Sequence, residues 1–197
     1  QIANEQADAV GEKLRKLRDT ELESMARYFL ASQKVSQSEF ATFAEFLKKN
    51  RSVVGWGWVV EIADSSKARF EDEVRRSGVK DYRVWQVDRS GATTAAMPGT
   101  SCYPVLYEES DAGAPSGQGL DLGSKEEWRW AFDETIRTGF PSCTDPFVLI
   151  NDPTRVKSMM FILPATADAV PGARRGFALA VVRMPDLLRA VRADSST

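Results

Sequence analysis

The sequence contains no histidine, and this absence excludes several kinds of catalytic site. Without an imidazole, no Ser-His-Asp or Cys-His arrangement can activate a nucleophile, and no His-ligated zinc centre can form. No P-loop and no C-x-x-C pair occurs either. The composition therefore favours a binding module over an enzyme, and we expect no catalytic residue, no bound metal and no cofactor.

The sequence also lacks an excess of basic residues. Its 26 Lys and Arg residues are balanced by 28 Asp and Glu residues, which gives a net charge of −2. Domains that bind nucleic acids normally carry a strong positive charge, because they neutralise phosphates. We therefore expect no nucleic-acid partner.

Long apolar runs are missing as well. The longest candidate, GFALAVV at residues 176–182, has the length of a strand, whereas a membrane-spanning helix needs about 18 or more apolar residues. No signal-peptide pattern is present. Because the chain begins at Gln1 and ends in a polar tail, we expect it to be part of a longer protein in which membrane segments flank this region.

Cysteine is scarce too. Cys102 and Cys143 are the only two in the chain. They allow a single disulfide bond, and they equally allow two separate thiols. The sequence leaves both alternatives open.

The first feature that is present is a long helix, predicted over residues 3–33. Apolar residues such as Val10, Leu14 and Leu17 recur every three or four positions, with charged residues between them. About 30 helical residues would span roughly 45 Å, which is more than most helices of globular proteins. The helix either packs on its own domain or forms a stalk that leaves a membrane and pairs with a partner chain. We favour the stalk.

A second helix is predicted after residue 36. Ser36 and Glu39 have the spacing of a capping box, S-x-x-E. The apolar side chains that follow form one stripe, which predicts a buried face made of Phe40, Phe43, Phe46 and Leu47.

From residue 52 onward the pattern changes to short strands. Helices are expected at residues 65–77, at 124–139 with a capping box at Ser124 and Glu127, and from Pro185 onward. Because strands dominate one region and helices lie at its edges, the fold class is predicted to be α+β. The six predicted strands cover residues 53–62, 82–87, 102–107, 147–150, 158–163 and 176–182.

Three acidic clusters, at residues 71–73, 108–109 and 126–127, offer paired carboxylates of the kind that glycosidases use. Neighbouring residues on a helix point in different directions, so we expect these clusters to be solvated surface. Residues 108–118 are expected to form a loop. Trp128 and Trp130 diverge on a helix, and only one of them is expected in the core.

Asp121 stands out because it lies between Leu120 and Leu122, just before a predicted helix. An aspartate in this position often caps a helix or accepts hydrogen bonds from the backbone. The alternative is a partly buried carboxylate that accepts hydrogen bonds from a ligand. Both interpretations remain open at this point.

Several segments taken together resemble the CHASE domain family. Residues 57–62 and 67–71 resemble its W-x-x-x-V and E-R-x-x-F-E blocks, and residues 103–107 resemble its Y-P-V-x-Y strand. Residues 119–122 (GLDL) resemble its G-[FY]-D-L block. The remaining blocks follow in order at residues 138–139, 144–149, 161–164 and 176–183, so that the resemblance covers roughly residues 50–190.

The resemblance implies an extracytoplasmic sensor domain, periplasmic or extracellular, of a receptor in the plasma membrane. Such domains lie between two transmembrane helices of receptor histidine kinases, diguanylate cyclases and related signalling proteins, and the plant members bind cytokinins. The implied fold is a long stalk helix followed by a PAS-like antiparallel sheet. The implied parts are a stalk and second helix (1–50), a PAS-like ligand-sensing domain (51–184) and an exit helix and tail leading toward a membrane segment (185–197).

The resemblance also implies a set of ligand-binding residues. Asp121 matches the aspartate that contacts the adenine in the plant receptors, and Cys143 lies about where a backbone group contacts the base. The pocket walls would come from the central strands. The residues expected there are Tyr103, Val105, Phe147, Leu149 and Phe161.

The sequence and the resemblance leave three functions to compare. The first is an ectodomain that binds a small ligand, for example an adenine-like or cytokinin-like molecule, and passes the signal through a stalk that forms a homodimer. The second is a ligand-free module for dimerisation or protein interaction. The third is a carboxylate-based hydrolase, which the absence of histidine and of a nucleophile motif disfavours. We favour the first.

Overall fold

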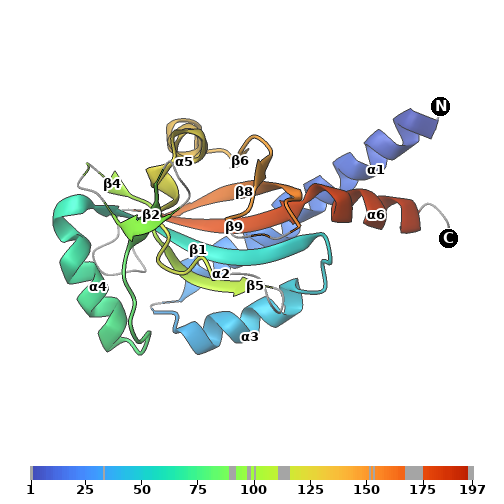
Figure 1. Ribbon diagram of the computed structural model, residues 1–197. Coiled ribbons are helices and arrows are strands. Elements are labelled where there is room, and N and C mark those ends of the chain that lie inside the picture. The colour runs from blue at the N-terminus through green and yellow to red at the C-terminus, as the bar shows by residue number, and fades with distance from the viewer. Residues whose placement is uncertain are drawn as a thin grey trace.

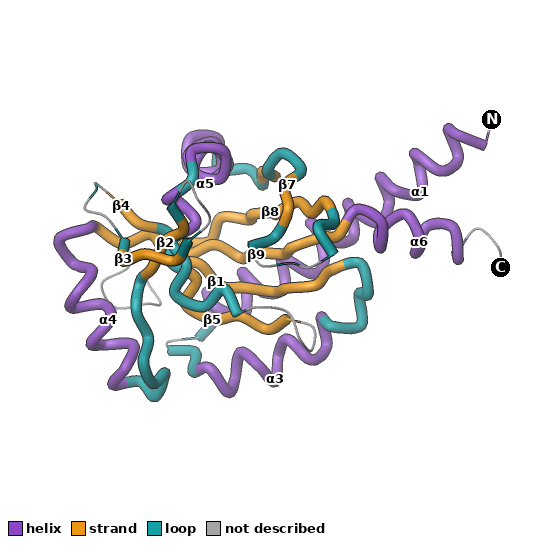
Figure 2. Tube along the Cα trace, viewed as in Figure 1, coloured by secondary structure: helices purple, strands orange, loops and turns teal. Residues whose placement is uncertain are grey.

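The fold is that of a computed structural model. The structure describes residues 2–32, 34–88, 92–96, 99, 101–110, 116–150, 152, 154–166 and 175–194. The chain forms a long N-terminal helix and a curled antiparallel sheet that resembles half a barrel (Figure 1). The predicted α+β class is therefore confirmed. Helices α3, α4 and α5 surround the sheet (Figure 2).

The helices of the chain include one long N-terminal helix and several shorter ones. The long helix consists of α1 (Ile2–Lys16), a π-helical turn η1 (Leu17–Leu22) and α2 (Glu23–Ala31). The other helices are α3 (Gln37–Leu47), the 3-10 turn η2 (Asp64–Ser66), α4 (Lys67–Arg76), the 3-10 turn η3 (Leu122–Ser124), α5 (Glu126–Thr138) and α6 (Met184–Asp194).

The main sheet has the first and last long strands at its centre. Strand β1 pairs with β9 on one side and with β4 and β5 on the other, and β9 continues through β8 to β6 and β7. A separate small sheet pairs β2 with β3. The bounds are β1 (Val53–Ala63), β2 (Trp85–Val87), β3 (Thr93–Ala95), β4 (Ser101–Cys102), β5 (Val105–Ser110), β6 (Ser142–Cys143), β7 (Phe147–Val148), β8 (Lys157–Thr166) and β9 (Arg175–Arg183).

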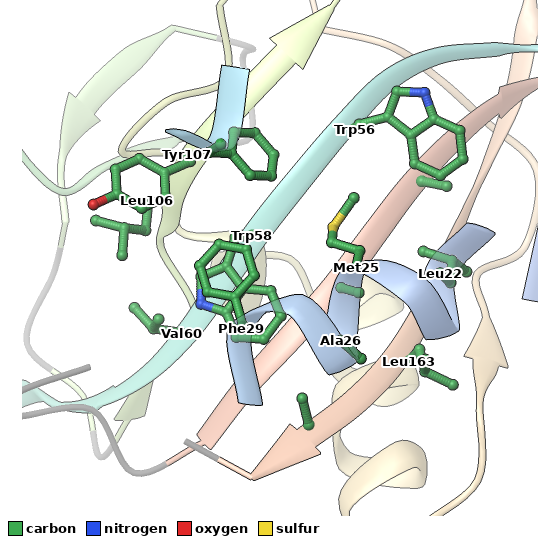
Figure 3. Packing of buried hydrophobic residues seen from close by; sticks show 14 of the residues in the cluster. Leu22, Met25, Ala26, Phe29, Trp56, Trp58, Val60, Leu106, Tyr107 and Leu163 are labelled. Atoms are coloured by element: carbon green, nitrogen blue, oxygen red, sulfur yellow. The ribbon is translucent and has the colours of Figure 1, made fainter. Parts of the chain in front are cut away.

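One face of the sheet packs on the long helix. Side chains alternate along a strand, so Trp56, Trp58 and Val60 of β1 all point to this face, where they meet Met25 and Phe29 of α2 (Figure 3). The rings of Phe29 and Trp58 stack with their centroids 3.7 Å apart. Burial of these large side chains fixes α2 to the sheet.

A glycine makes room for this stack. A Cβ atom at Gly176 of β9 would lie 2.3 Å from Cζ2 of Trp58, which is far too close. The β9 strand therefore needs glycine at this position in order to pass beside the Trp58 ring.

The other face of the sheet packs on α5 and on the turn η3. Here the ring of Tyr103 stacks on Phe132 at 4.7 Å, and Phe132 meets Phe177 edge-on at 5.1 Å. Trp128 is 3% exposed and Trp130 is 59% exposed, which confirms that only one of the two is in the core. The sheet thus separates two apolar clusters.

Part of the long helix packs on its own domain, and the pairing of a stalk with a partner chain stays a prediction. Its second half packs on its own domain, whereas α1 extends beyond the sheet and lies beside α6 (Figure 1). The two helices leave the sheet at the same end, where both termini lie.

Helix α3 confirms one expected cap and corrects the expected stripe. Ser36 accepts a hydrogen bond from the Glu39 backbone, and the Glu39 carboxylate accepts one from the Ser36 backbone, so both halves of the capping box are present. The stripe is shorter than predicted, because Phe46 is 60% exposed, with the Lys49 ammonium 5.2 Å from its ring.

Four local predictions were wrong. Strand β5 continues to Ser110, so residues 108–110 are not loop, because β1 offers them backbone partners. The expected capping box at Ser124 is absent, since Lys125 occupies the N-cap of α5 and Ser124 Oγ donates to the Asp121 carbonyl instead. The strands predicted at 82–87 and 147–150 shorten to β2 and β7.

The structure also answers the question of the two cysteines. Cys102 and Cys143 are free thiols, which selects one of the two alternatives left open by the sequence. Among the described residues, no helix is both long enough and apolar enough to cross a bilayer.

Candidate functional site

A cavity of about 100 Å³ lies between the sheet and the layer formed by α5, η3 and β7. Its walls come from β1, β5, β8 and β9 on the sheet side and from Leu122, Trp128 and Phe147 on the other. We call it the α5-side cavity. The lining residues are Gly55, Trp56, Gly57, Trp85, Val105, Glu108, Ser116, Gly117, Leu120, Leu122, Trp128, Phe147, Leu149, Ile150, Met160, Leu179 and Val181.

The cavity exists because β1 presents two glycines to it. The side chains of Trp56 and Trp58 point to the long helix. Gly55, which precedes Trp56, and Gly57, which lies between the two tryptophans, therefore face the cavity. A Cβ atom at Gly55 would lie 3.8 Å from the Val181 side chain, in ordinary van der Waals contact. The missing side chains on β1 thus leave the space that a larger residue would fill.

Glu108 is the acidic group of the cavity. Its carboxylate accepts hydrogen bonds from the Gly117 backbone at 2.5 Å and from Ser116 Oγ at 3.4 Å. Burial raises the pKa of the Glu108 carboxyl above its ordinary value, and the hydrogen bonds from Gly117 and Ser116 only partly offset this. A carboxyl group accepts hydrogen bonds when it is ionised, and it can also donate one when it is protonated.

Two tryptophans supply indole N–H groups around the cavity. Nε1 of Trp85 donates to the Gln118 carbonyl at 2.8 Å. Nε1 of Trp128 is buried and has no hydrogen-bond partner among the described residues. Because an unpaired buried donor costs free energy, an acceptor on a ligand would stabilise the site. Trp128 also meets Phe147 edge-on at 5.2 Å, and the Lys125 ammonium lies 4.9 Å from its ring.

Three of the residues predicted from the sequence lie together in this cavity. Val105, Phe147 and Leu149 all line it. Val105 comes from β5, and the other two come from β7 and the segment after it.

Asp121 and Tyr103 lie in the layer behind the cavity wall. Asp121 is 5% exposed, and its Oδ1 accepts hydrogen bonds from the backbones of Tyr103 at 2.8 Å and Gly123 at 2.9 Å. These contacts match the alternative of a cap and backbone clamp. Burial raises the pKa of Asp121, although both backbone hydrogen bonds and the charge of Arg129 act in the opposite direction.

Arg129 reinforces the same turn. Its guanidinium donates to the carbonyls of Gly123 and Ser101, both at 2.9 Å, and lies 5.4 Å from the Tyr103 ring. Asp121 and Arg129 therefore hold Leu120 and Leu122, which flank Asp121, against the cavity.

Cys143 and Phe161 lie elsewhere. They border a separate hollow of about 250 Å³ against the long helix, together with Leu14, Arg18 and Leu22. The structure therefore does not bring them together with the residues of the α5-side cavity. Burial raises the pKa of the Cys143 thiol.

Glu108, Trp128 and Gly55 are among the cavity residues that the sequence interpretation missed. Glu108 was assigned to solvated surface with Glu109, yet only Glu109 faces outward, where it pairs with Lys48 at 2.5 Å. The helical pattern predicts Trp128 only as a core candidate, and the strand predicted at residues 53–62 assigns no role to Gly55. The alternation of glycine and tryptophan at residues 55–58 is the signal that points to a gap on one face of β1.

A chain of contacts leads from the cavity to the helices at the end of the sheet. Asp152 follows the cavity residue Ile150 by two positions, and its carboxylate pairs with Arg183, the last residue of β9, at 3.2 Å. The Arg183 backbone donates to the carbonyl of Ser52 at 3.1 Å. Arg183 directly precedes α6.

The same chain of contacts reaches the long helix through Asn50. Its side chain accepts hydrogen bonds from the backbone and hydroxyl of Ser52 and donates to the Glu21 carboxylate at 2.7 Å. Glu21 is buried within the π-helical turn η1.

The described residues contain no group of three or more Cys, Asp or Glu side chains that could hold a metal ion.

A half-barrel sheet, a long helix packed on one face and a mostly apolar cavity under the other form a fold with room for a small ligand. The comparison with protein families identifies the family of the chain. The model of the CHASE domain matches residues 33–197, and the chain belongs to this family. It is an extracytoplasmic sensor domain that is not itself catalytic, and CHASE domains typically bind a small ligand.

The other comparisons add little. The chain resembles a solved structure described as "Methyl-accepting Chemotaxis protein X", with 17% sequence identity and a TM-score of 0.42. The match covers 96% of this chain and 62% of that one. The search of curated proteins finds no match.

Proposed function

We propose that the α5-side cavity is the ligand-binding site of this sensor domain and that its ligand is a small, uncharged, planar heterocycle. The observation that carries the proposal is the cavity itself. Its lining is mostly apolar and, besides the Ser116 hydroxyl, offers a ligand two polar groups, the Glu108 carboxyl and the unpartnered indole N–H of Trp128. Apolar walls with a few polar groups that fix orientation are typical of small-molecule sites. A heterocycle with one acceptor and one donor would satisfy both groups.

The size of the cavity limits the ligand. At about 100 Å³ it is smaller than the 300–1,000 Å³ that is typical of drug-sized pockets. A compact heterocycle fits this volume better than an N6-substituted adenine, which would require the walls to move apart. Asp121 and Tyr103 would act by holding Leu120 and Leu122 in place, and direct contact of Asp121 with a ligand stays a prediction.

The proposal includes a route for the signal. Ligand contact with Leu149 and Ile150 would bias the position of Asp152, and through Arg183 and Asn50 the bias would reach α6 and the long helix. The effect is limited to the difference in affinity of the ligand for the two arrangements.

The whole receptor is part of the proposal. Residues 1–50 would form the stalk and second helix, residues 51–184 the sensing domain, and residues 185–197 the exit toward a membrane segment. The side-by-side course of α1 and α6 supports two helices that continue to one membrane. We propose a homodimer through the stalk and, as output, a histidine kinase of a two-component system or a diguanylate cyclase.

A thermal-shift titration tests the ligand proposal. The panel contains free purines, N6-substituted adenines and smaller planar heterocycles. A ligand present at about 100 times its dissociation constant adds about 2.7 kcal/mol of stability, which should raise the unfolding midpoint by roughly 5–10 °C.

Two variants of Gly55 locate the site. Gly55→Ala places a methyl group in ordinary contact and should preserve the shift, whereas Gly55→Leu fills the cavity and should abolish it. A shift that survives in Gly55→Leu would place the ligand elsewhere. No shift with any member of the panel would instead favour the ligand-free dimerisation module.

A further inference from the structure

A second hollow, of about 380 Å³, lies on the opposite side of the molecule from the α5-side cavity, between the end of the long helix and α4. We call it the α4 groove. Its volume falls within the range that small-molecule sites usually have. The groove is lined by Phe29, Lys34, Val35, Phe70, Glu73, Val74, Arg76, Ser77, Leu106 and Tyr107.

The floor of the groove is apolar and rigid. Phe29, Leu106 and Tyr107 belong to the cluster that joins the long helix to the sheet. The Tyr107 hydroxyl donates to the Val35 carbonyl at 2.9 Å, which fixes the connection between α2 and α3 at the edge of the groove. Leu106 is kept on this face by a register shift of β5 against β1, while Val105 points to the α5-side cavity.

Glu73, which lines the groove, has an unsatisfied carboxylate oxygen. Oε1 of Glu73 pairs with Arg69 Nε at 2.8 Å. Oε2 of Glu73 is buried and has no hydrogen-bond partner among the described residues. A charged oxygen in this position costs free energy until a donor reaches it, and an ammonium group is the strongest such donor.

Two positive charges complete the lining. Lys34 and Arg76 both border the groove, and neither forms an ion pair with another residue in the described part of the chain. They offer donors to a carboxylate that lies near the ammonium site. The groove thus combines a carboxylate that can bind a cationic group, two cationic side chains that can bind an anionic group, and an apolar floor.

We propose that the α4 groove binds an α-amino acid with an apolar side chain. The ammonium group of the ligand meets Oε2 of Glu73, its carboxylate meets Lys34 and Arg76, and its side chain packs on Phe29, Phe70 and Leu106. The bound amino acid links the end of the long helix to α4. This site is independent of the α5-side cavity, so either proposal can fail without the other.

Titration calorimetry of the whole chain with L-leucine and L-phenylalanine tests the groove. Each amino acid is compared with its N-acetyl derivative, which has no ammonium group, and with its amide, which has no carboxylate. We expect both amino acids to bind and each derivative to bind about tenfold or more weakly, because each loses a charge-assisted contact. Glycine, which has no side chain to cover the floor, should bind more weakly still.

Variants then locate the binding. Glu73→Gln should weaken binding of L-leucine about tenfold, and the double variant Lys34→Ala/Arg76→Ala should do the same. Lys80→Ala removes an exposed positive charge outside the lining of the groove and should not weaken binding. Gly55→Leu, which fills the other cavity, should leave the affinity unchanged.

Three results would overturn the proposal: no binding of either amino acid up to about 10 mM, equal binding of the N-acetyl derivatives, or loss of binding in Gly55→Leu with full binding in Glu73→Gln. Should Glu73→Gln fail to fold, the comparison of the derivatives on the unaltered chain decides alone.

Discussion

At the scale of single residues, variants of Asp121 distinguish a structural role of this side chain from a ligand-binding role. Its Oδ1 accepts two backbone hydrogen bonds in a buried turn. Asp121→Ala would leave the N–H groups of Tyr103 and Gly123 unpaired, and we expect a loss of about 2–3 kcal/mol in the free energy of unfolding. Asp121→Asn keeps an acceptor oxygen and should lose clearly less.

Urea unfolding of the two Asp121 variants measures this difference. If Asp121→Ala were as stable as the unaltered chain but no longer bound the ligand, the aspartate would contact the ligand directly, as the resemblance to the plant receptors implies.

Glu108 should make stability depend on pH. Because burial raises its pKa in the folded state above the ordinary value of 4.5, the folded chain holds this proton more tightly than the unfolded chain does. The resulting contribution to stability is complete below about pH 4.5 and is lost as the pH rises through the raised pKa.

Glu108→Gln should remove this part of the pH dependence. Unfolding in urea at a series of pH values between about 4 and 8 gives the difference between the two chains. The gap in stability should grow in favour of the variant as pH rises. Asp121, whose pKa is also raised, contributes equally to both chains and cancels. Parallel profiles would show that Glu108 is not the group responsible.

These residues also show how far sequence patterns reach. Val105, Phe147 and Leu149 could be predicted as walls because apolar residues on central strands face a core or a pocket. Glu108 could not be predicted, because its burial depends on residues 116–117 folding back over β5. Glu109, the adjacent acid in the sequence, instead lies at the surface, where it pairs with Lys48.

At the scale of elements, the long helix was predictable and its π-helical turn was not. The apolar spacing sets the helix, but the shift in hydrogen bonding at Leu17–Leu22 coincides with a tertiary contact, Glu21 with Asn50. π-helical turns inside long helices often lie at functional positions. Asn50 lies between α3 and β1, so this contact joins the helix to the central strand.

A double-mutant cycle measures that contact. Glu21→Ala and Asn50→Ala should each destabilise the fold, and their interaction energy should be about 1–3 kcal/mol, since the hydrogen bond involves a charged group in a buried position. The free energies of unfolding of the two single variants and the double variant give this value. Additive effects would mean that the contact contributes nothing of its own.

At the scale of the whole molecule, the sheet separates two sites with different chemistry. The α5-side cavity is mostly apolar and has one carboxyl group, Glu108, whereas the α4 groove is lined by side chains of both signs of charge. The strand order, with β1 beside β9 at the centre, could not be read from local patterns because it pairs segments more than 100 residues apart. This pairing nevertheless places the cavity close to the start of α6 and to the long helix.

The tryptophans give the most direct test that the α5-side cavity binds the ligand. The chain contains five, and their indole N–H signals in a proton–nitrogen NMR spectrum can be assigned by single Trp→Phe replacements. Trp85 and Trp128 border the cavity, Trp58 stacks on Phe29 against the long helix, and Trp130 is exposed. Addition of the purines and smaller heterocycles should shift the signals of Trp85 and Trp128 and leave Trp58 and Trp130 in place. Shifts confined to Trp58 or Trp130, or no shift with any member, would contradict the assignment of this cavity as the ligand site.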